Sequence, residues 1–164
     1  MTVLGIDPGL DGAIAVLTDD GSLVNVFDMP TIAGEGAKNR RSISSPLLAH
    51  IIRTAAPAKA YCELVGPRPS DGVVGAFGFG RSRGQIEGVL AALGVPVEMV
   101  APTTWKRAAN IPPGRENKDV ARSRAISSWP SQAALFARKA DCDRAEAALI
   151  AATSIKLNGI RHDR

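Results

Sequence analysis

The sequence is poor in aromatic residues and cysteine, and it contains no long apolar run. Phe, Trp and Tyr make up 4% of the 164 residues, so a core must be built from aliphatic side chains and alanine. No stretch approaches the roughly 18 apolar residues of a membrane-spanning helix, and Asp7 interrupts an N-terminal run too short for a signal peptide. Cys62 and Cys142 form neither a zinc-finger spacing nor a disulfide framework. We therefore expect a reduced, cytoplasmic protein without a membrane segment.

The chain also lacks the motifs of several enzyme classes. It has no Walker-type glycine-rich loop, which leaves ATP use unsupported. Neither His50 nor His162 has a Ser or Cys partner that would predict nucleophilic catalysis. Cys142 without a neighbouring histidine makes a poor zinc site.

The composition is that of a folded domain with a basic surface. Hydrophobic residues account for 45% and charged residues for 22%, which argues against both disorder and a membrane protein. A chain of this length is expected to form one domain, residues 1–164, with a sizeable core. The net charge of +4 and the pI near 9.4 suit a polyanionic partner such as nucleic acid.

Hydrophobic patterning and turn residues predict an α/β fold around one sheet. The expected strands are residues 3–7, 13–17, 23–29, 58–63 and 95–100. A first helix is expected to begin at residue 46, and five more are expected over 81–93, 102–109, 116–128, 131–137 and 141–156. Residues 30–41 predict an exposed basic loop. Residues 66–80 contain five glycines and two phenylalanines, which predicts a long loop or a loosely wound helix start. Irregular stretches of this length are often functional.

One carboxylate stands out near the N-terminus, where an apolar run brings Asp7 into a Pro-Gly turn and a second apolar run follows. This pattern predicts a hairpin that opens the sheet. A carboxylate at the end of a buried strand is costly unless a cation or hydrogen bonds satisfy it. Asp7 is therefore a candidate metal ligand, with an ordinary turn as the alternative.

Acids occur at two more places where apolar segments end or begin. Glu63 ends the strand predicted over 58–63, and Asp141, Asp143 and Glu146 open the last helix, where Asp143 and Glu146 share a face. Mg²⁺ prefers carboxylate oxygens, and two such ions about 4 Å apart can hold a phosphodiester, activate water and stabilise the leaving oxygen. Taken singly, these acids suit a solvated strand end or an N-terminal helix charge. Taken jointly, they predict a two-metal site.

Five segments in order carry a family resemblance. They are Gly5-Ile-Asp7-Pro-Gly9, Ala60-Tyr-Cys-Glu63, Gly84-Gln-Ile-Glu-Gly88, Val100-Ala-Pro-Thr-Thr-Trp-Lys106 and Asp143-Arg-Ala-Glu-Ala-Ala-Leu-Ile-Ala151, with Lys118 before the last. The chain resembles the RuvC-type Holliday-junction resolvases of the RNase H-like superfamily, most of all the compact versions of bacteriophages and prophages. The resemblance implies an RNase H-like fold with a central mixed five-stranded sheet flanked by helices. It also implies a homodimeric endonuclease that uses two Mg²⁺ ions, or Mn²⁺, to nick a four-way DNA junction symmetrically.

The resemblance assigns roles residue by residue. Asp7 corresponds to the acid that bridges both metals, Glu63 to the fourth-strand acid, and Asp143 and Glu146 to the acids of the last helix. The family's last acid is most often Asp, whereas this chain has the longer Glu146. Asp141 is an alternative to Asp143 for the family's acid that precedes this last one.

The expected DNA contacts are basic or aromatic. Lys106 and Lys118 match family positions where lysines face the backbone near the scissile phosphate, and Lys118 is also expected to assist catalysis. The other candidates are Arg115, Arg122, Phe77, Phe79, Arg81, Arg83, Lys38, Arg40 and Arg41. Either phenylalanine could wedge into the junction or begin the core stripe of the next helix. That helix is expected to pack against a second copy, while Trp105 and Trp129 are expected to be packing residues.

Other functions remain open from the sequence. The same acids suit a nuclease that cuts forks, flaps or RNA–DNA hybrids, and loss of a competent acid set would leave a non-catalytic junction-binding module. An actin-like or sugar-kinase relative shares a strand-Asp-Gly opening. The short chain and the lack of a second phosphate loop argue against that relative.

Overall fold

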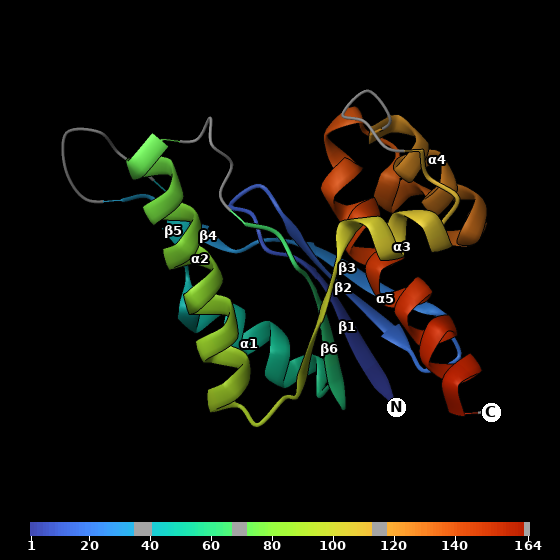
Figure 1. The fold of residues 1–164 in the computed structure, drawn as a ribbon, viewed down its shortest axis with the longest axis horizontal. Helices are drawn as coiled ribbons and strands as arrows, with labels where there is room; N and C mark the ends of the chain where they lie inside the picture. Colours follow the sequence, from blue (N-terminus) through green and yellow to red (C-terminus); the bar gives the residue numbers. More distant parts are fainter. Residues whose placement is uncertain (35–40, 67–71, 113–117, 163–164) are drawn as a thin grey trace.

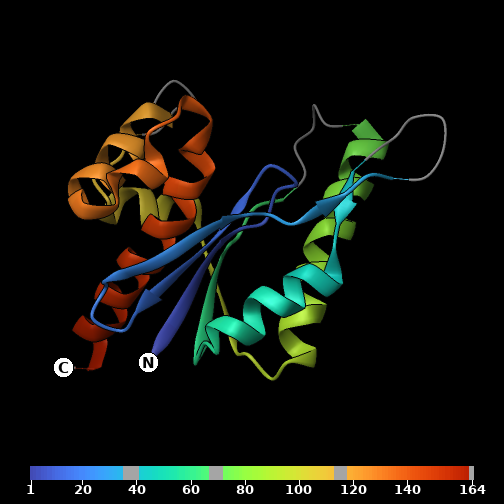
Figure 2. The same ribbon diagram turned by 180° about the vertical axis from the view of Figure 1, so that it is seen from behind.

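The structure, a computed structural model, describes residues 1–34, 41–66, 72–112 and 118–162. A twisted five-stranded sheet with the strand order β3-β2-β1-β6-β7 runs through the middle of the molecule (Figure 1). Helices cover both of its faces, and Figure 2 shows the same layers from behind. Among the described helices, none is long and apolar enough to cross a membrane.

The sheet is mixed, and β1 lies at its centre. β1 (Thr2–Asp7), β2 (Ala13–Thr18) and β3 (Leu23–Asp28) form an antiparallel meander, whereas β6 (Lys59–Glu63) runs parallel to β1 and β7 (Val97–Val100) parallel to β6. Because β1 and β6 are parallel neighbours, their carboxyl ends meet at one edge of the sheet. The two acids that end these strands therefore come together without any contribution from a loop.

Different helices cover the two faces of the sheet (Figure 1). One face carries α5 (Cys142–His162) with α3 (Pro102–Ala108), α4 (Lys118–Ser128) and the short 3₁₀ segments η3 (Pro130–Phe136) and η4 (Lys139–Asp141). The other face carries α1 (Ser45–Ala55) and α2 (Gly72–Ala92).

The side chains of β1 alternate between the two faces. Val3 belongs to the hydrophobic cluster under α5, whereas Leu4 and Ile6 belong to the cluster under α1 and α2. This alternation follows from the two-residue repeat of a strand. It makes β1 the element shared by both cores.

Gly5 determines how closely α5 approaches the sheet. A Cβ atom on Gly5 would lie 2.0 Å from the carbonyl oxygen of Ala147 and 2.9 Å from Cβ of Ala151. The facing residues of α5 are small and buried, so the helix backbone lies almost directly on β1. This contact sets the first turns of α5 beside the end of β1.

The structure distinguishes between two alternatives for one segment and differs from the sequence-based expectation in two others. Helix α2 begins at Gly72, so residues 72–80 are helical and the loosely wound helix start was the correct alternative. Ser82, Ile86 and Leu90 are buried at four-residue intervals and anchor the helix on the sheet despite its glycines. Within and beside the predicted basic loop, β4 (Thr31–Ile32) pairs with β5 (Ser42–Ile43). The helix predicted over 131–137 is instead the 3₁₀ segment η3, Pro130–Phe136.

Candidate metal centre and nucleic-acid interface

Three carboxylates from two distant segments meet at the end of β1. Asp7, Asp143 and Glu146 each place a carboxylate oxygen within 4.8 Å of the others. Asp7 is the last residue of β1. Asp143 and Glu146 lie in the first turns of α5, three residues apart and therefore on the same face of the helix. The close packing of β1 and α5 at Gly5 brings these elements together.

Glu63 supplies a fourth negative charge to this cluster. It ends β6 and is 6% exposed, and its charge is one of those that raise the pKa of Asp7. Burial is the main cause of that rise, followed by the negative charges of Glu63, Asp143 and Glu146, while the Gly9 backbone N–H opposes it. The pKa of Asp7 is about 8, against an ordinary value of 3.8. Several buried carboxylates with this mutual repulsion form the hard-oxygen donor set that suits Mg²⁺ or Mn²⁺.

The raised pKa of Asp7 predicts how stability depends on pH without a divalent cation. The folded protein keeps a proton on Asp7 that the unfolded chain loses above about pH 4. The contribution of protonated Asp7 to the free energy of unfolding is therefore fully present below about pH 4 and is lost as the pH rises through about 8. In EDTA, we expect the free energy of unfolding of wild type to fall by a few kcal/mol relative to that of Asp7→Asn between pH 5 and pH 8. The slope should be no more than about 1.4 kcal/mol per pH unit.

Urea unfolding of both proteins at several pH values measures this difference. Saturating Mg²⁺ should restore the stability of wild type at pH 8 and leave Asp7→Asn nearly unchanged. Parallel pH profiles of the two proteins in EDTA would contradict the prediction.

Helix α3 contributes two side chains to the same place. The indole N–H of Trp105 donates to Oε1 of Glu63 at 2.8 Å, and the ammonium of Lys106 lies 3.6 Å from Oε1 of Glu146. Lys106 therefore lies beside the acid cluster and faces a carboxylate, while its expected contact with the DNA backbone stays a prediction. Trp105 and Trp129 are 0% and 8% exposed, which confirms that both are packing residues.

Asp141 lies outside the three-acid cluster, although the sequence left it open as a metal ligand. Its carboxylate accepts a hydrogen bond of 2.7 Å from the Arg138 guanidinium and another of 2.8 Å from the Arg138 backbone N–H. Burial alone would raise the pKa of Asp141, but the bonds from Arg138 hold the pKa below its ordinary value. Asp141 thus closes the turn that leads into α5, and Asp143 takes the position beside Asp7.

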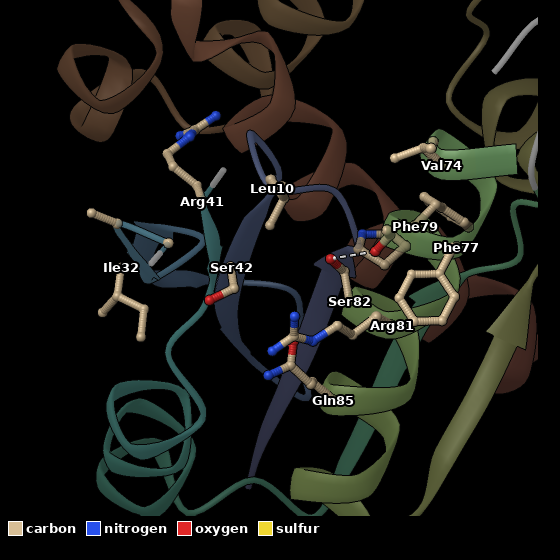
Figure 3. Close-up of a pocket in the computed structure, with 15 residues that line it drawn as sticks. Leu10, Ile32, Arg41, Ser42, Val74, Phe77, Phe79, Arg81, Ser82 and Gln85 are labelled. Atoms are coloured by element: carbon tan, nitrogen blue, oxygen red, sulfur yellow. Dashed lines mark hydrogen bonds between the residues drawn. The ribbon is translucent and has the colours of Figure 1, made fainter. Parts of the chain in front are cut away.

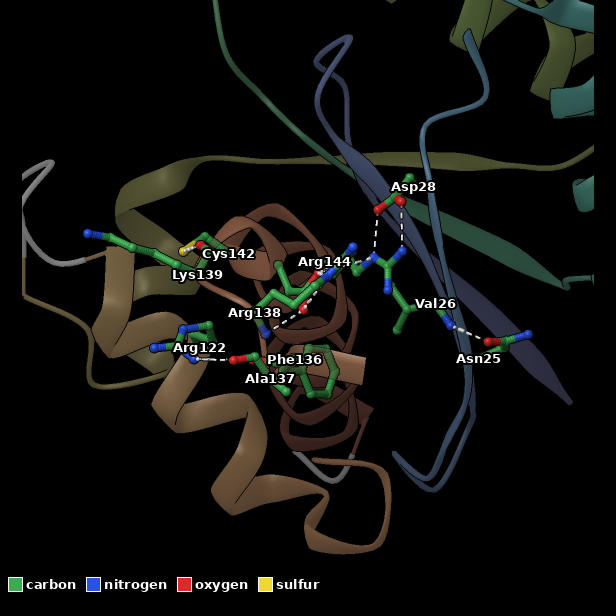
Figure 4. Close-up of polar contacts among 11 residues, drawn as sticks. Asn25, Val26, Asp28, Arg122, Phe136, Ala137, Arg138, Lys139, Cys142 and Arg144 are labelled. Carbon is green, nitrogen blue, oxygen red and sulfur yellow. Dashed lines mark hydrogen bonds and ion pairs between the residues drawn. The ribbon is translucent and has the colours of Figure 1, made fainter. Parts of the chain in front are cut away.

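Arg144 ties the start of α5 to the sheet. Its Nε and one terminal nitrogen each donate to Asp28 of β3 at 2.6 Å, a bidentate ion pair (Figure 4). The Arg144 guanidinium also lowers the pKa of Asp28. Because Arg144 directly follows Asp143, this pair helps to fix the turn that carries the cluster.

The predicted aromatic and basic contacts on α2 line a cavity of about 1190 Å³. The cavity lies between the N-terminal half of α2 and the β4–β5 ribbon, and Leu10 of the β1–β2 turn forms part of its wall (Figure 3). Phe77, Phe79, Arg81 and Arg41 all contribute to the lining. Phe77 is 72% exposed, so the core-stripe alternative was wrong for this residue, whereas Phe79 is partly buried.

Several predicted DNA contacts have other partners. Arg83 donates to Glu87 and to the Val65 carbonyl, and Arg122 donates to Asp119 and to the Phe136 and Ala137 carbonyls. Arg41 pairs with Asp11. The remaining candidates Lys38, Arg40 and Arg115 lie outside the described residues, as does the side chain of Lys118, whose backbone begins α4.

Sequence reasoning missed three residues that shape the site. Gly5 and Arg144 position α5, and Trp105 contacts Glu63. Each lies inside a segment that carried the family resemblance, so position in a motif was the available signal. Their roles depend on contacts between segments far apart in the sequence.

Comparisons with known proteins show the fold. The chain matches RuvC of Thermus thermophilus, solved in complex with a Holliday-junction substrate, with a TM-score of 0.66 and 18% identity over 96% of each chain. It matches another Thermus thermophilus RuvC structure with a TM-score of 0.57 and 13% identity, covering 96% of this chain and 97% of that one. The yeast mitochondrial Holliday-junction resolvase Ydc2 matches with a TM-score of 0.58 and 14% identity, covering 98% of this chain and 82% of Ydc2.

No protein-family model and no curated protein matches the sequence. The structural likenesses extend over nearly the whole chain, and they confirm an RNase H-like fold of the RuvC type with a mixed five-stranded sheet.

Proposed function

We propose that this protein is a metal-dependent endonuclease that resolves four-way DNA junctions. The observation that carries the proposal is the cluster of Asp7, Asp143 and Glu146 at the end of β1, in a chain with the fold of RuvC. Glu63 borders the cluster, and its negative charge acts on Asp7. A fold of this type with an acidic cluster at this edge supports phosphodiester hydrolysis.

Asp7, Glu63, Asp143 and Glu146 would hold the cations, two Mg²⁺ ions in the form we propose. The ions would supply an activated water and charge neutralisation at the leaving oxygen. Asp7, the last residue of β1, would be a central ligand of this set, because the charges of all the other three carboxylates act on it. Lys106, 3.6 Å from Glu146, would place a fixed positive charge near the phosphoryl oxygens.

The cavity beside α2 gives the DNA a route to this site. Pro8 and Leu10, which follow Asp7 in the chain, form part of its wall, so the cavity begins next to the end of β1 that carries the acid cluster. Arg81 projects from α2 and is exposed, and exposed Phe77 offers a face on which a base can stack. We propose that DNA near the branch point follows this cavity, with Lys118 and the basic residues 38–41 on its backbone.

The outer face of α2 supports a symmetric dimer. Val73, Phe77, Gly80, Gly84 and Gly88 recur at three- and four-residue intervals and are all exposed. A Cβ atom on any of these three glycines would meet nothing within 4 Å. Such a stripe lets a second α2 approach closely, and a two-fold dimer would place two acid clusters on one junction. We propose that the paired nicks arise from this arrangement.

Cleavage of a mobile four-way junction in Mg²⁺, beside linear duplex, fork, flap and RNA–DNA hybrid, tests the substrate. We expect symmetric nicks on the junction and at least about a hundredfold slower cutting of linear duplex, a difference of about 2.7 kcal/mol. A cruciform in a circular plasmid should give linear product, because both strands are cut in one encounter.

Other outcomes would redirect the proposal. Preferential cutting of a fork, flap or hybrid would keep the acid site and replace the substrate. Nicked circles without linear product would contradict the paired arrangement. Tight junction binding without cutting in Mg²⁺ or Mn²⁺ would favour the non-catalytic module.

A further inference from the structure

We infer that Trp105 is a positioning residue of the proposed metal site, which holds Glu63 in its metal-binding orientation and supports Lys106. The inference rests on the proposed function, since it concerns the same acids. It gives Trp105 a role beyond that of a large apolar side chain in the core.

The first contact joins Trp105 to an acid of the site. Its indole Nε1–H donates to Oε1 of Glu63 at 2.8 Å, with Trp105 0% and Glu63 6% exposed. An indole has a single N–H, and its rigid ring points that donor in one direction. The hydrogen bond therefore restricts rotation of the Glu63 carboxylate.

The second contact joins the same ring to Lys106. The ammonium lies 5.1 Å from the centre of the Trp105 ring, within the range of a cation–π interaction, and 3.6 Å from Oε1 of Glu146. Trp105 thus contacts a carboxylate through its edge and an ammonium through its face. One side chain of α3 sets the positions of two charged groups that come from β6 and from α3 itself.

Trp129 shows what a purely structural tryptophan does in this fold. It belongs to the same hydrophobic cluster as Trp105 and is 8% exposed. Its Nε1–H also donates a hydrogen bond, but the acceptor is the backbone carbonyl of Gly21, in the β2–β3 turn. That turn lies at the opposite edge of the sheet from Asp7, because β2 runs antiparallel to β1. The two tryptophans therefore differ in whether the N–H reaches an acid of the site.

This difference supplies a matched pair of variants. Trp105→Phe and Trp129→Phe each remove one indole N–H and shrink one buried ring in the same cluster. Mn²⁺ binding to the full chain without DNA, followed by the EPR signal of free Mn²⁺, reports on the acid site independently of cleavage. We expect Trp105→Phe to weaken Mn²⁺ binding about tenfold, as loss of a residue that orients a metal ligand does elsewhere, and Trp129→Phe to leave it within twofold.

A shape-preserving replacement separates positioning from packing. Replacement of Trp105 by 3-benzothienylalanine keeps the bicyclic ring but has no N–H donor, so the fold should be retained. We expect this protein to melt close to wild type and still to bind Mn²⁺ about as weakly as Trp105→Phe. The Mg²⁺ concentration for half-maximal junction cleavage should rise in parallel, with junction affinity in EDTA unchanged.

Each outcome bears on the inference. Wild-type Mn²⁺ affinity in the benzothienyl protein would overturn it, and so would equal losses in Trp105→Phe and Trp129→Phe. Weaker Mn²⁺ binding only at position 105, in a protein whose wild type cuts no junction, would support the inference and reject the proposed substrate. Absence of Mn²⁺ binding by wild type would overturn both.

Discussion

Asp7→Asn will abolish cleavage of a four-way junction and leave junction binding intact. Asp7 lies among three other carboxylates, so burial and their negative charges oppose its own charge, which a bound cation would favour. An asparagine keeps the shape of the side chain and removes the negative charge that would bind a cation in the proposed site. We expect cleavage to fall at least about a thousandfold, equivalent to roughly 4 kcal/mol of transition-state stabilisation. Binding should persist because it rests on basic residues.

The measurement is single-turnover cleavage in Mg²⁺ beside a gel-shift titration in EDTA. Asp19→Asn provides a control, because Asp19 is an exposed carboxylate beyond β2, at the edge of the sheet opposite Asp7. It should cut at the wild-type rate. Cleavage by Asp7→Asn at the wild-type rate would end the proposal for this acid site.

Gly5→Ala will disrupt both stability and the metal site. The new Cβ would lie 2.0 Å from a backbone oxygen of α5, and a backbone atom cannot move aside as a flexible side chain can. Either the helix shifts away from β1 or the strand distorts, and both changes separate Asp7 from Asp143 and Glu146. We expect a loss of about 3 kcal/mol in the free energy of unfolding, the upper part of the range for overpacked cores.

Urea denaturation and Mn²⁺ titration measure these two effects. Gly159→Ala is the matched control, since Gly159 also belongs to an element of this contact, α5, and a Cβ there would meet nothing within 4 Å. It should be neutral or stabilising by up to about 1 kcal/mol, because alanine is the better helix former. A Gly5→Ala protein as stable as wild type, with undiminished Mn²⁺ affinity, would show that the β1–α5 contact can relax.

The elements carried by strong local patterns were predictable from the sequence. β1 and β2 are apolar runs separated by a clear turn, and β6 is a similar apolar run that ends in an acid. Asp7 and Glu63 were therefore correctly predicted to lie at strand ends. Helix α2 was the weak point, because five glycines between 66 and 80 predict a break. Burial of Ser82, Ile86 and Leu90 on the sheet outweighs the intrinsic cost of those glycines.

The amino-acid sequence by itself determined the kind of chemistry available, which is oxygen ligands for a divalent cation with basic residues around them. It also determined that Asp7 and Glu63 end strands, since hydrophobic patterning and turn residues are local properties. Only the tertiary structure placed Asp143 rather than Asp141 in the acid cluster, because Arg138 holds the Asp141 carboxylate in the η4 turn. It likewise brought α5 against Gly5 and Trp105 against Glu63, because each contact joins segments that only the packed sheet and helices bring together.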